Sequence, residues 1–161
     1  MKRLRYSLIA AASFGNFAKV ILYENAKLKV GNGADPAILL LGVCGKFQGM
    51  LGTIDFGTSE GVISCNNCTD VPDNNNSIAC KIDGSNGVSY VSDPEMIRDR
   101  RLELHCDNPY AGATHISAVR IGARHERCFS SGDVYVLGGE AAGGAVVFKK
   151  MATWANTFHI A

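Results

Sequence analysis

Short stretches of alternating apolar and polar residues, separated by turn residues, are the feature that most constrains the fold of this chain. Leu102–Cys106 and His115–Ile121 both alternate in this way, as half-buried β-strands do. The 18 glycines against 4 prolines suit many tight turns better than a helical bundle. No linker and no repeated motif divides the chain. We therefore predict a mostly β fold, an antiparallel β-sandwich or barrel of about ten strands.

Several connections support that prediction. Residues 78–82 and 88–91 flank Asp83-Gly84-Ser85-Asn86-Gly87 and predict a hairpin. Residues 134–137 and 145–148 flank a glycine-rich turn in the same way. The apolar run Ala37–Val43 predicts a strand buried on both faces. One short helix is expected from Asp93 and Pro94, which fit the cap and first position of a helix.

The first 18 residues have the layout of a secretory signal peptide. Lys2, Arg3 and Arg5 precede an apolar run, and Ala18 fits the last position before a cut. We expect residues 1–18 to be a signal peptide and 19–161 to form a single β-rich domain. The alternative is an N-terminal helix retained in the folded protein. The run is too short for a spanning helix, so no membrane span is expected.

Six cysteines follow the predicted leader. An even number behind a secretory leader indicates a disulfide framework, although six cysteines allow 15 pairings. We expect a secreted, extracellular protein in which bridges form among Cys44, Cys65, Cys68, Cys80, Cys106 and Cys128. The sequons at Asn67 and Asn75 predict N-glycosylation in the polar loop 64–77.

Zinc is the alternative use of these cysteines. Cys65-x-x-Cys68 and His125-x-x-Cys128 have acceptable spacings for a Cys₃His site. The two halves lie far apart in sequence and three cysteines would be left over. We expect neither a bound metal nor a cofactor.

All arginines after the leader lie between residues 98 and 127, together with three of the four histidines. We predict an arginine-rich functional surface in this region. The predicted binding residues are Arg98, Arg100, Arg101, Arg120, Arg124, His125 and Arg127. A plainer interpretation is the solvated face of a sheet. A third is a small ribonuclease that uses His, Glu and Arg side chains. No catalytic spacing identifies an active site, so an enzyme is not the favoured class.

The charge balance bears on the partner. From Lys19 onward the chain has 13 Lys plus Arg against 15 Asp plus Glu. Nucleic-acid affinity depends on neutralising phosphates, so a nucleic-acid partner is not expected. A protein or glycan target is the expectation, and self-association through strand edges at 37–43 or 145–148 is the alternative.

In its leader and cysteine content the chain resembles the small secreted cysteine-containing proteins of filamentous fungi, including host-directed effectors. The resemblance implies a secreted β-rich protein that binds a host or environmental target, without a cofactor. Two alternatives stay open: a β-sandwich coat or filament subunit, and a small secreted ribonuclease-like hydrolase.

Overall fold

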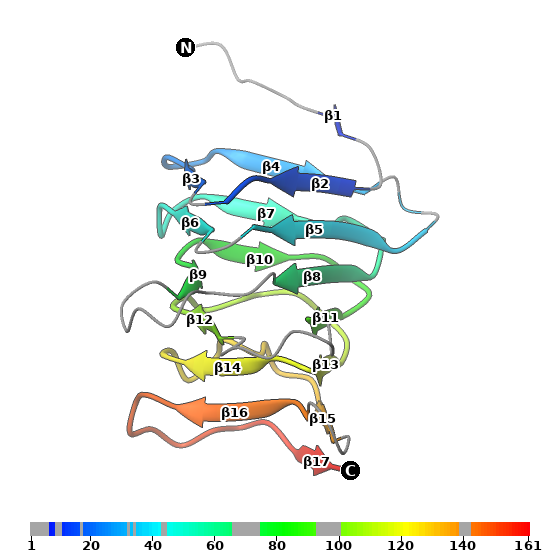
Figure 1. The fold of residues 1–161 in the computed structure, drawn as a ribbon, viewed down its shortest axis with the longest axis vertical. Helices are drawn as coiled ribbons and strands as arrows, with labels where there is room; N and C mark the ends of the chain where they lie inside the picture. The colour runs from blue at the N-terminus through cyan, green and yellow to red at the C-terminus, as the bar shows by residue number, and fades with distance from the viewer. Residues whose placement is uncertain are drawn as a thin grey trace.

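In a computed structural model, the chain forms a stack of parallel strands, a three-sided β-solenoid (Figure 1). The structure describes residues 7–8, 11–16, 18–31, 33, 35–42, 45–65, 75–92, 101–138 and 143–161. Successive strands lie on different sides of the stack; the first four coils contribute one strand to each of the three sides, and the later described coils contribute strands to sheets B and C only. Strand pairing is parallel throughout the described chain.

The three sheets are named A, B and C in the order in which the chain visits them. Sheet A contains β1 (Ser7–Leu8), β4 (Lys27–Val30), β7 (Thr53–Asp55) and β10 (Lys81–Asp83). Sheet B contains β2 (Ala11–Phe14), β5 (Ala37–Leu41), β8 (Gly61–Cys65), β11 (Val88–Val91), β13 (Thr114–Ser117), β15 (Val134–Leu137) and β17 (Phe158–Ile160). Sheet C contains β3 (Lys19–Ile21), β6 (Lys46–Gln48), β9 (Asn76–Ile78), β12 (Arg101–Leu104), β14 (Arg120–Ala123) and β16 (Ala145–Phe148).

The core is built from straight rows of inward side chains, one residue from each coil. On sheet B one such row joins partners in register: Leu39, Ile63, Tyr90, Ile116 and Val136. All five are buried. Alternation within each strand sends every second residue inward. This explains why single coils show strand-like alternation although no coil could bury its apolar side alone.

Asn108 continues the inward ladder where sheet A ends after β10. Its side-chain Oδ1 accepts a hydrogen bond from the Ile82 amide at 3.0 Å, and its Nδ2 donates to the Cys128 carbonyl at 2.7 Å. The amide is buried and joins the backbones of two flanking coils. It therefore supplies the partners that a fifth strand would otherwise supply, as buried backbone groups require.

The prediction of an antiparallel sandwich or barrel is wrong. The turn at Asp83–Gly87 is a corner that joins β10 in sheet A to β11 in sheet B, not a hairpin. The glycine-rich segment after Leu137 likewise joins sheet B to sheet C. A corner and a hairpin both need residues with positive φ, such as Gly84 and Gly87. Local sequence therefore cannot distinguish the two.

Three further expectations need correction or limits. Residues 37–41 are not buried on both faces, because Ile38 and Leu40 are each 37% exposed. They also lie inside sheet B, between β2 and β8, and not at an edge. Residues 145–148 do form an edge strand of sheet C. The described residues contain no helix, and the helix predicted from Asp93 falls outside them.

The N-terminal segment is part of the stack in this structure. Strand β1 pairs with β4, and β2 pairs with β5. Cleavage after Ala18 stays a prediction, as do secretion and glycosylation. Asn75 lies half-buried just before β9, and Asn67 falls outside the described residues.

The expected disulfide framework is not present in the described chain. Cys65, Cys80, Cys106 and Cys128 are buried and form no disulfide among the described residues, while Cys44 and Cys68 fall outside those residues. Cys65 and Cys128 belong to the hydrophobic core. Stability therefore comes from stacked apolar rows, and the cysteines act there as small hydrophobic side chains. The prediction of a disulfide-stabilised sandwich is wrong on both counts.

We expect these four thiols to resist alkylation in the folded protein without any reductant present. Burial raises the pKa of Cys80 and of Cys128 to about 12, and it also raises the pKa of Cys106. Thiolates are the reactive form, so alkylation should need unfolding. Peptide mapping by mass spectrometry after iodoacetamide, with and without urea, checks this. Prior treatment with dithiothreitol should change nothing, and cross-linked peptides containing these cysteines would contradict the structure.

Candidate anion-binding face

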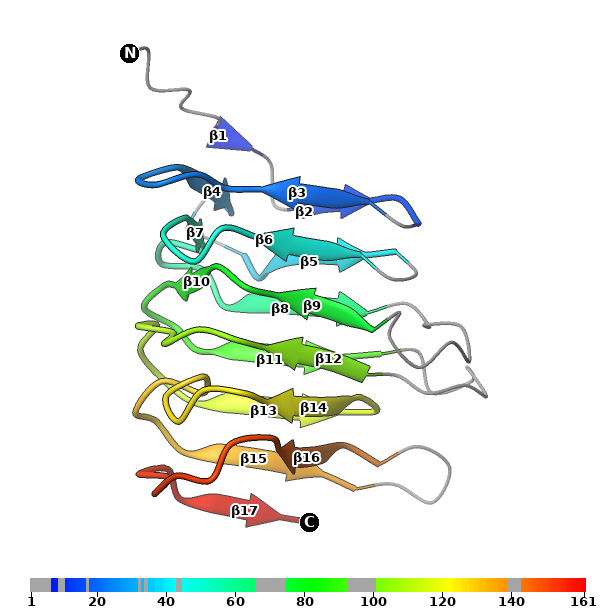
Figure 2. The same cartoon turned by 90° about the vertical axis from the view of Figure 1, so that its left-hand side faces the viewer.

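The outer surface of sheet C, which faces the viewer in Figure 2, is the basic face of the solenoid. Its outward positions follow from the burial alternation of β3, β6, β12 and β14, in which Val20, Phe47, Leu102, Leu104 and Ile121 point inward. The described outward positions carry six cations: Lys19, Lys46, Arg101, Arg120, Arg124 and Lys149. They carry one acid, Glu103.

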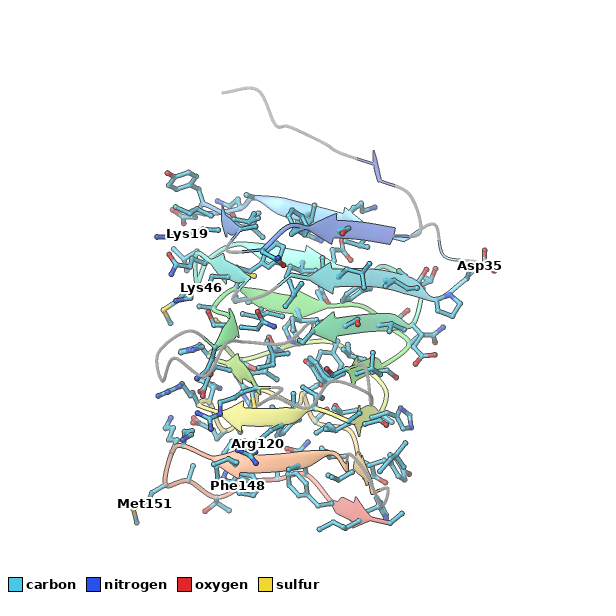
Figure 3. The ribbon with its side chains drawn as sticks, in the orientation of Figure 1. Lys19, Asp35, Lys46, Arg120, Phe148 and Met151 are labelled. Atoms are coloured by element: carbon cyan, nitrogen blue, oxygen red, sulfur yellow. The ribbon has the colours of Figure 1, made fainter. Side chains whose placement is uncertain are left out.

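Strand register arranges these cations. Lys19 of β3 is the direct neighbour of Lys46 of β6, and Arg101 of β12 is the neighbour of Arg120 of β14. Neighbouring parallel strands lie ~4.8 Å apart. Five such steps separate the coil of Lys19 from that of Lys149, so the basic face extends about 24 Å along the solenoid. Figure 3 labels Lys19, Lys46 and Arg120 on this side of the molecule, with Asp35 on the opposite side.

Sheet A carries charges that compensate one another. Its outward residues are Lys27, Lys29, Lys81, Asp55 and Asp83. Lys27 Nζ lies 3.0 Å from Asp55 Oδ2. Burial acts to raise the pKa of Asp55, but the hydrogen bonds from Lys27 and the Gly57 amide outweigh it and hold that pKa below its ordinary value. Sheet A therefore presents nearly balanced charge.

Sheet B presents no formal charge on its described outward strand positions. Its outer rows are mostly apolar residues, serines and aromatic rings. His115, Tyr135 and His159 stack in one row, with ring centroids 5.2 Å and 4.6 Å apart. Among the described strand positions, the largest excess of positive charge is thus on sheet C, although the whole chain is close to neutral.

Glu103 lies at the centre of the basic face and is held by an arginine. Arg124 Nε donates to Glu103 Oε2 at 2.5 Å. The Glu103 side chain is 5% exposed, and Oε1 has no hydrogen-bond partner among the described residues. Gly122, its neighbour on β14, makes room for it, since a Cβ there would lie 2.6 Å from the carboxylate. The carboxylate therefore lies flat beneath the arginines, and Arg124 stays oriented.

His105 completes the group. It follows β12 and is adjacent in register to Arg124, whose amide donates to the Leu104 carbonyl at 3.0 Å. Burial, helped by the Arg124 charge, lowers the pKa of His105 below its ordinary value. At neutral pH the imidazole is thus uncharged and can serve as a hydrogen-bond donor or acceptor for a polar ligand.

The structure brings together part of the predicted set. Arg101, Arg120 and Arg124 share the basic face, and Arg98 and Arg100 fall outside the described residues. His125 and Arg127 lie in the turn that leaves sheet C. There the Arg127 amide donates to His125 Nδ1 at 3.2 Å, and the Arg127 guanidinium pairs with Asp107. His125 and Arg127 therefore serve the turn and not the basic face.

Sequence analysis missed Lys19, Lys46 and the role of Gly122. Lys19 was placed at the boundary of the leader and Lys46 in an unassigned segment. The 27-residue spacing of Lys19 and Lys46 equals the spacing of Gly61 and Val88, two other partners in register. A search for recurring spacings, rather than for recurring residues, could have placed both lysines on one side.

The described residues offer no site for a metal. They contain no group of three or more His, Cys, Asp or Glu side chains able to hold one. Cys68, one of the four residues in the alternative zinc site, falls outside them. No helix in the described part of the chain is long and apolar enough to cross a membrane.

Comparison with known proteins gives no match to a family model, a curated protein or a solved structure. The functional argument therefore depends on the geometry and charge of the solenoid itself.

Proposed function

We propose that this protein binds an acidic polysaccharide along the basic face of sheet C. The supporting observation is the separation of charge: cations gather on one side, sheet A is balanced, and sheet B is uncharged at its described outward positions. Strand register holds the cations in fixed positions: Lys19 lies beside Lys46 and Arg101 beside Arg120, each pair one ~4.8 Å strand step apart. Arginine binds carboxylate and sulfate groups through two parallel hydrogen bonds.

A polysaccharide suits this face better than a nucleic acid. Single-stranded nucleic acids bind through aromatic side chains on which the bases stack. The outward positions described on sheet C include no Phe, Tyr or Trp side chain; they offer Gln48, Ser77 and His105 instead. Amide, hydroxyl and neutral imidazole groups can exchange hydrogen bonds with sugar hydroxyls. This composition favours a polymer of hydroxyl and acidic groups.

Such binding needs no catalytic group. Glu103 is buried and tied to Arg124, so it orients the arginine and does not offer a free acid or base to a substrate. The protein would then act as a binding module for an acidic glycan in its surroundings. The glycan target expected from the sequence would then be an acidic polysaccharide.

Charge removal on sheet C is expected to weaken binding to heparin and to polygalacturonate. The triple variant Lys19→Gln, Lys46→Gln and Arg120→Gln should raise Kd at least about tenfold, since each lost contact removes a favourable ion pair and its counterion release. Raising the salt concentration should weaken polysaccharide binding by the native protein and reduce the difference in Kd between it and the variant. Isothermal titration calorimetry measures both effects.

The matched control removes the same charge elsewhere. Lys29→Gln, Lys81→Gln and Arg127→Gln change net charge equally but lie on or beside sheet A. The control should bind heparin and polygalacturonate like the native protein does, and neither protein should bind neutral dextran. Equal weakening by the two triple variants would show a non-specific charge effect. Tighter binding of poly(U) than of either polysaccharide would replace the proposal with a nucleic-acid function.

A further inference from the structure

Two neighbouring turns between sheets C and A carry exposed apolar side chains. The first turn joins β3 to β4, and the second joins β6 to β7. Tyr23 is 75% exposed in the first turn, and Met50 and Leu51 are 64% and 61% exposed in the second. Ile21, the last residue of β3, is 46% exposed. We call these four residues the apolar corner.

Backbone hydrogen bonds hold the two turns side by side. The Thr53 amide donates to the Ala26 carbonyl at 2.9 Å, which joins the second turn to the end of the first. The Lys81 amide donates to the Gly52 carbonyl at 3.0 Å, which joins the second turn to the start of β10. The second turn therefore has described chain on both sides of it, and the apolar corner lies along the side of the stack (Figure 2, left).

The apolar side chains of the second turn serve no purpose in the fold. Met50 and Leu51 are its two central residues, and the turn closes where the Gly52 amide donates to the Gly49 carbonyl at 2.8 Å. Central positions of turns ordinarily carry Gly, Pro, Asn, Asp or Ser. Neither Met50 nor Leu51 belongs to the hydrophobic core or packs against it. Neighbouring exposed apolar side chains of this kind mark an interaction site.

Lysines surround the apolar corner on both sides. Four strands next to it begin with a lysine, namely β3, β6, β4 and β10, at Lys19, Lys46, Lys27 and Lys81. Two acids lie among them: Asp55 pairs with Lys27, and Glu24 is exposed in the first turn. Cations therefore outnumber acids around the corner, and a partner with negative charge would complement them.

We infer that the apolar corner binds the surface of an anionic lipid bilayer, with Tyr23, Met50 and Leu51 entering the headgroup layer. A tyrosine ring is amphipathic and favours the membrane–water interface. The aliphatic side chains gain free energy by leaving water, and the lysines are attracted to anionic headgroups. The inference does not rest on polysaccharide binding, although the basic face includes Lys19 and Lys46.

A lipid surface suits this corner better than another protein does. A stable protein interface draws on about 20 residues a side, whereas the apolar corner has four on two projecting turns. Lysine is depleted in protein interfaces, but lysines beside exposed apolar groups are typical of proteins that bind anionic membranes. Projecting side chains can enter a fluid headgroup layer without a partner surface of matching shape.

Sedimentation with vesicles tests the inference on the full chain. The native protein should bind vesicles of phosphatidylcholine and phosphatidylserine in equal parts, and should bind pure phosphatidylcholine more weakly. The double variant Met50→Asn and Leu51→Asn should lower the partition coefficient on the mixed vesicles at least about tenfold, because both side chains lose their burial in the lipid. Its Kd for heparin should stay unchanged, since neither substitution alters charge. Circular dichroism verifies its fold.

Two further variants make the result specific. Leu40→Asn and Leu137→Asn together form the matched control, because these leucines are 37% and 41% exposed on the outer side of sheet B. The control should bind the mixed vesicles like the native protein. Glu24→Gln removes the exposed acid of the first turn and should raise the partition coefficient at least about twofold. A gain in binding cannot come from misfolding.

Several outcomes would overturn the inference. Equal vesicle binding by the native protein and the Met50 and Leu51 double variant would mean that charge alone holds the lipid, and equal losses in both double variants would mean a general effect of polarity. A native dimer in size-exclusion chromatography that this variant cannot form would assign the corner to a second copy instead. Native protein that binds vesicles but not heparin would overturn the proposed function and leave this inference standing.

Discussion

Replacing Gly49 by alanine is expected to destabilise the protein by about 3 to 5 kcal/mol. Gly49 has a φ of +106°, a backbone conformation that residues with a side chain rarely adopt. A Cβ at this position would lie 1.8 Å from the Leu22 carbonyl oxygen of the preceding coil. That carbonyl belongs to the backbone and cannot rotate away, so the two coils would have to separate.

The location makes separation costly. The Leu22 amide donates to the Gln48 carbonyl at 2.8 Å, directly beside the clash, and the Gly52 amide donates to the Gly49 carbonyl at 2.8 Å. Moving the corner outward would break the contact between the first two coils along sheets A and C. Loss of buried hydrogen bonds and of packing would then add to the backbone strain.

Gly57→Ala provides the matched control. Gly57 also has positive φ, at +62°, but nothing lies within 4 Å of the added Cβ. This variant should lose only about 1 kcal/mol, the cost of the backbone conformation alone. Urea unfolding followed by circular dichroism compares the two. Similar losses in both variants would show that the coils are not in the close contact that this structure describes.

The sequence predicts single strands well but does not predict how they pair. Alternation correctly predicts a strand within Leu102–Cys106, because it depends on one inward and one outward face, whatever the strand direction. It does not separate His115–Ile121 into β13 and β14, which belong to different sheets. It cannot report the direction of pairing. Parallel sheets ordinarily alternate with helices, and the sequence predicts only one short helix, which led to an antiparallel prediction. Here short glycine-containing corners make the crossovers instead.

Coil length is the second reason for the failure. Partners in register are 27 residues apart at Gly61 and Val88 but 20 apart at Thr114 and Val134. A repeat of variable length, in which only the apolar character recurs, leaves no visible motif. The cysteines were misread for a related reason, since Cys65 and Cys128 replace apolar residues within core rows. Their number and not their positions suggested bridges.

The candidate site was predictable in composition but not in geometry. Clustering of arginines between residues 98 and 127 predicts one basic region, and Arg101, Arg120 and Arg124 of this group lie on sheet C. Only the register shows that Arg101 and Arg120 share one side while Arg127 turns away to Asp107. The burial of Glu103 and its ion pair with Arg124 are likewise not visible in the sequence, because they depend on Gly122 of the neighbouring strand.

The ion pair of Glu103 and Arg124 is expected to matter more for stability than any other charged contact on the basic face. Arg124→Gln removes the donor 2.5 Å from a carboxylate that is almost wholly buried. An unpaired buried charge is strongly unfavourable, and the expected loss is about 2 to 4 kcal/mol. Part of the cost is avoided because the Arg124 side chain itself is 45% exposed, which lets water approach that side of the pair.

A double-mutant cycle separates the pair from the two side chains. Glu103→Gln keeps the shape and removes the charge, so alone it should cost about 1 kcal/mol. Added to Arg124→Gln, it should restore stability. The double variant should lose at least about 1 kcal/mol less unfolding free energy than the sum of the two single losses. Urea unfolding of the four proteins gives the coupling energy. Additive losses would mean that the carboxylate is not held by Arg124.

The same four proteins connect stability to function. If Glu103 serves to orient Arg124, the double variant folds but presents an amide where the native protein presents a guanidinium. The native carboxylate cancels about one positive charge, and the double variant lacks both charges, so the net charge of the basic face is the same in the two proteins. Weaker heparin binding by the double variant would then report the lost guanidinium fork and not a change in total charge. Unchanged binding would place the polymer on Lys19, Lys46 and Arg120 alone, with Glu103 and Arg124 acting only to hold β12 against β14.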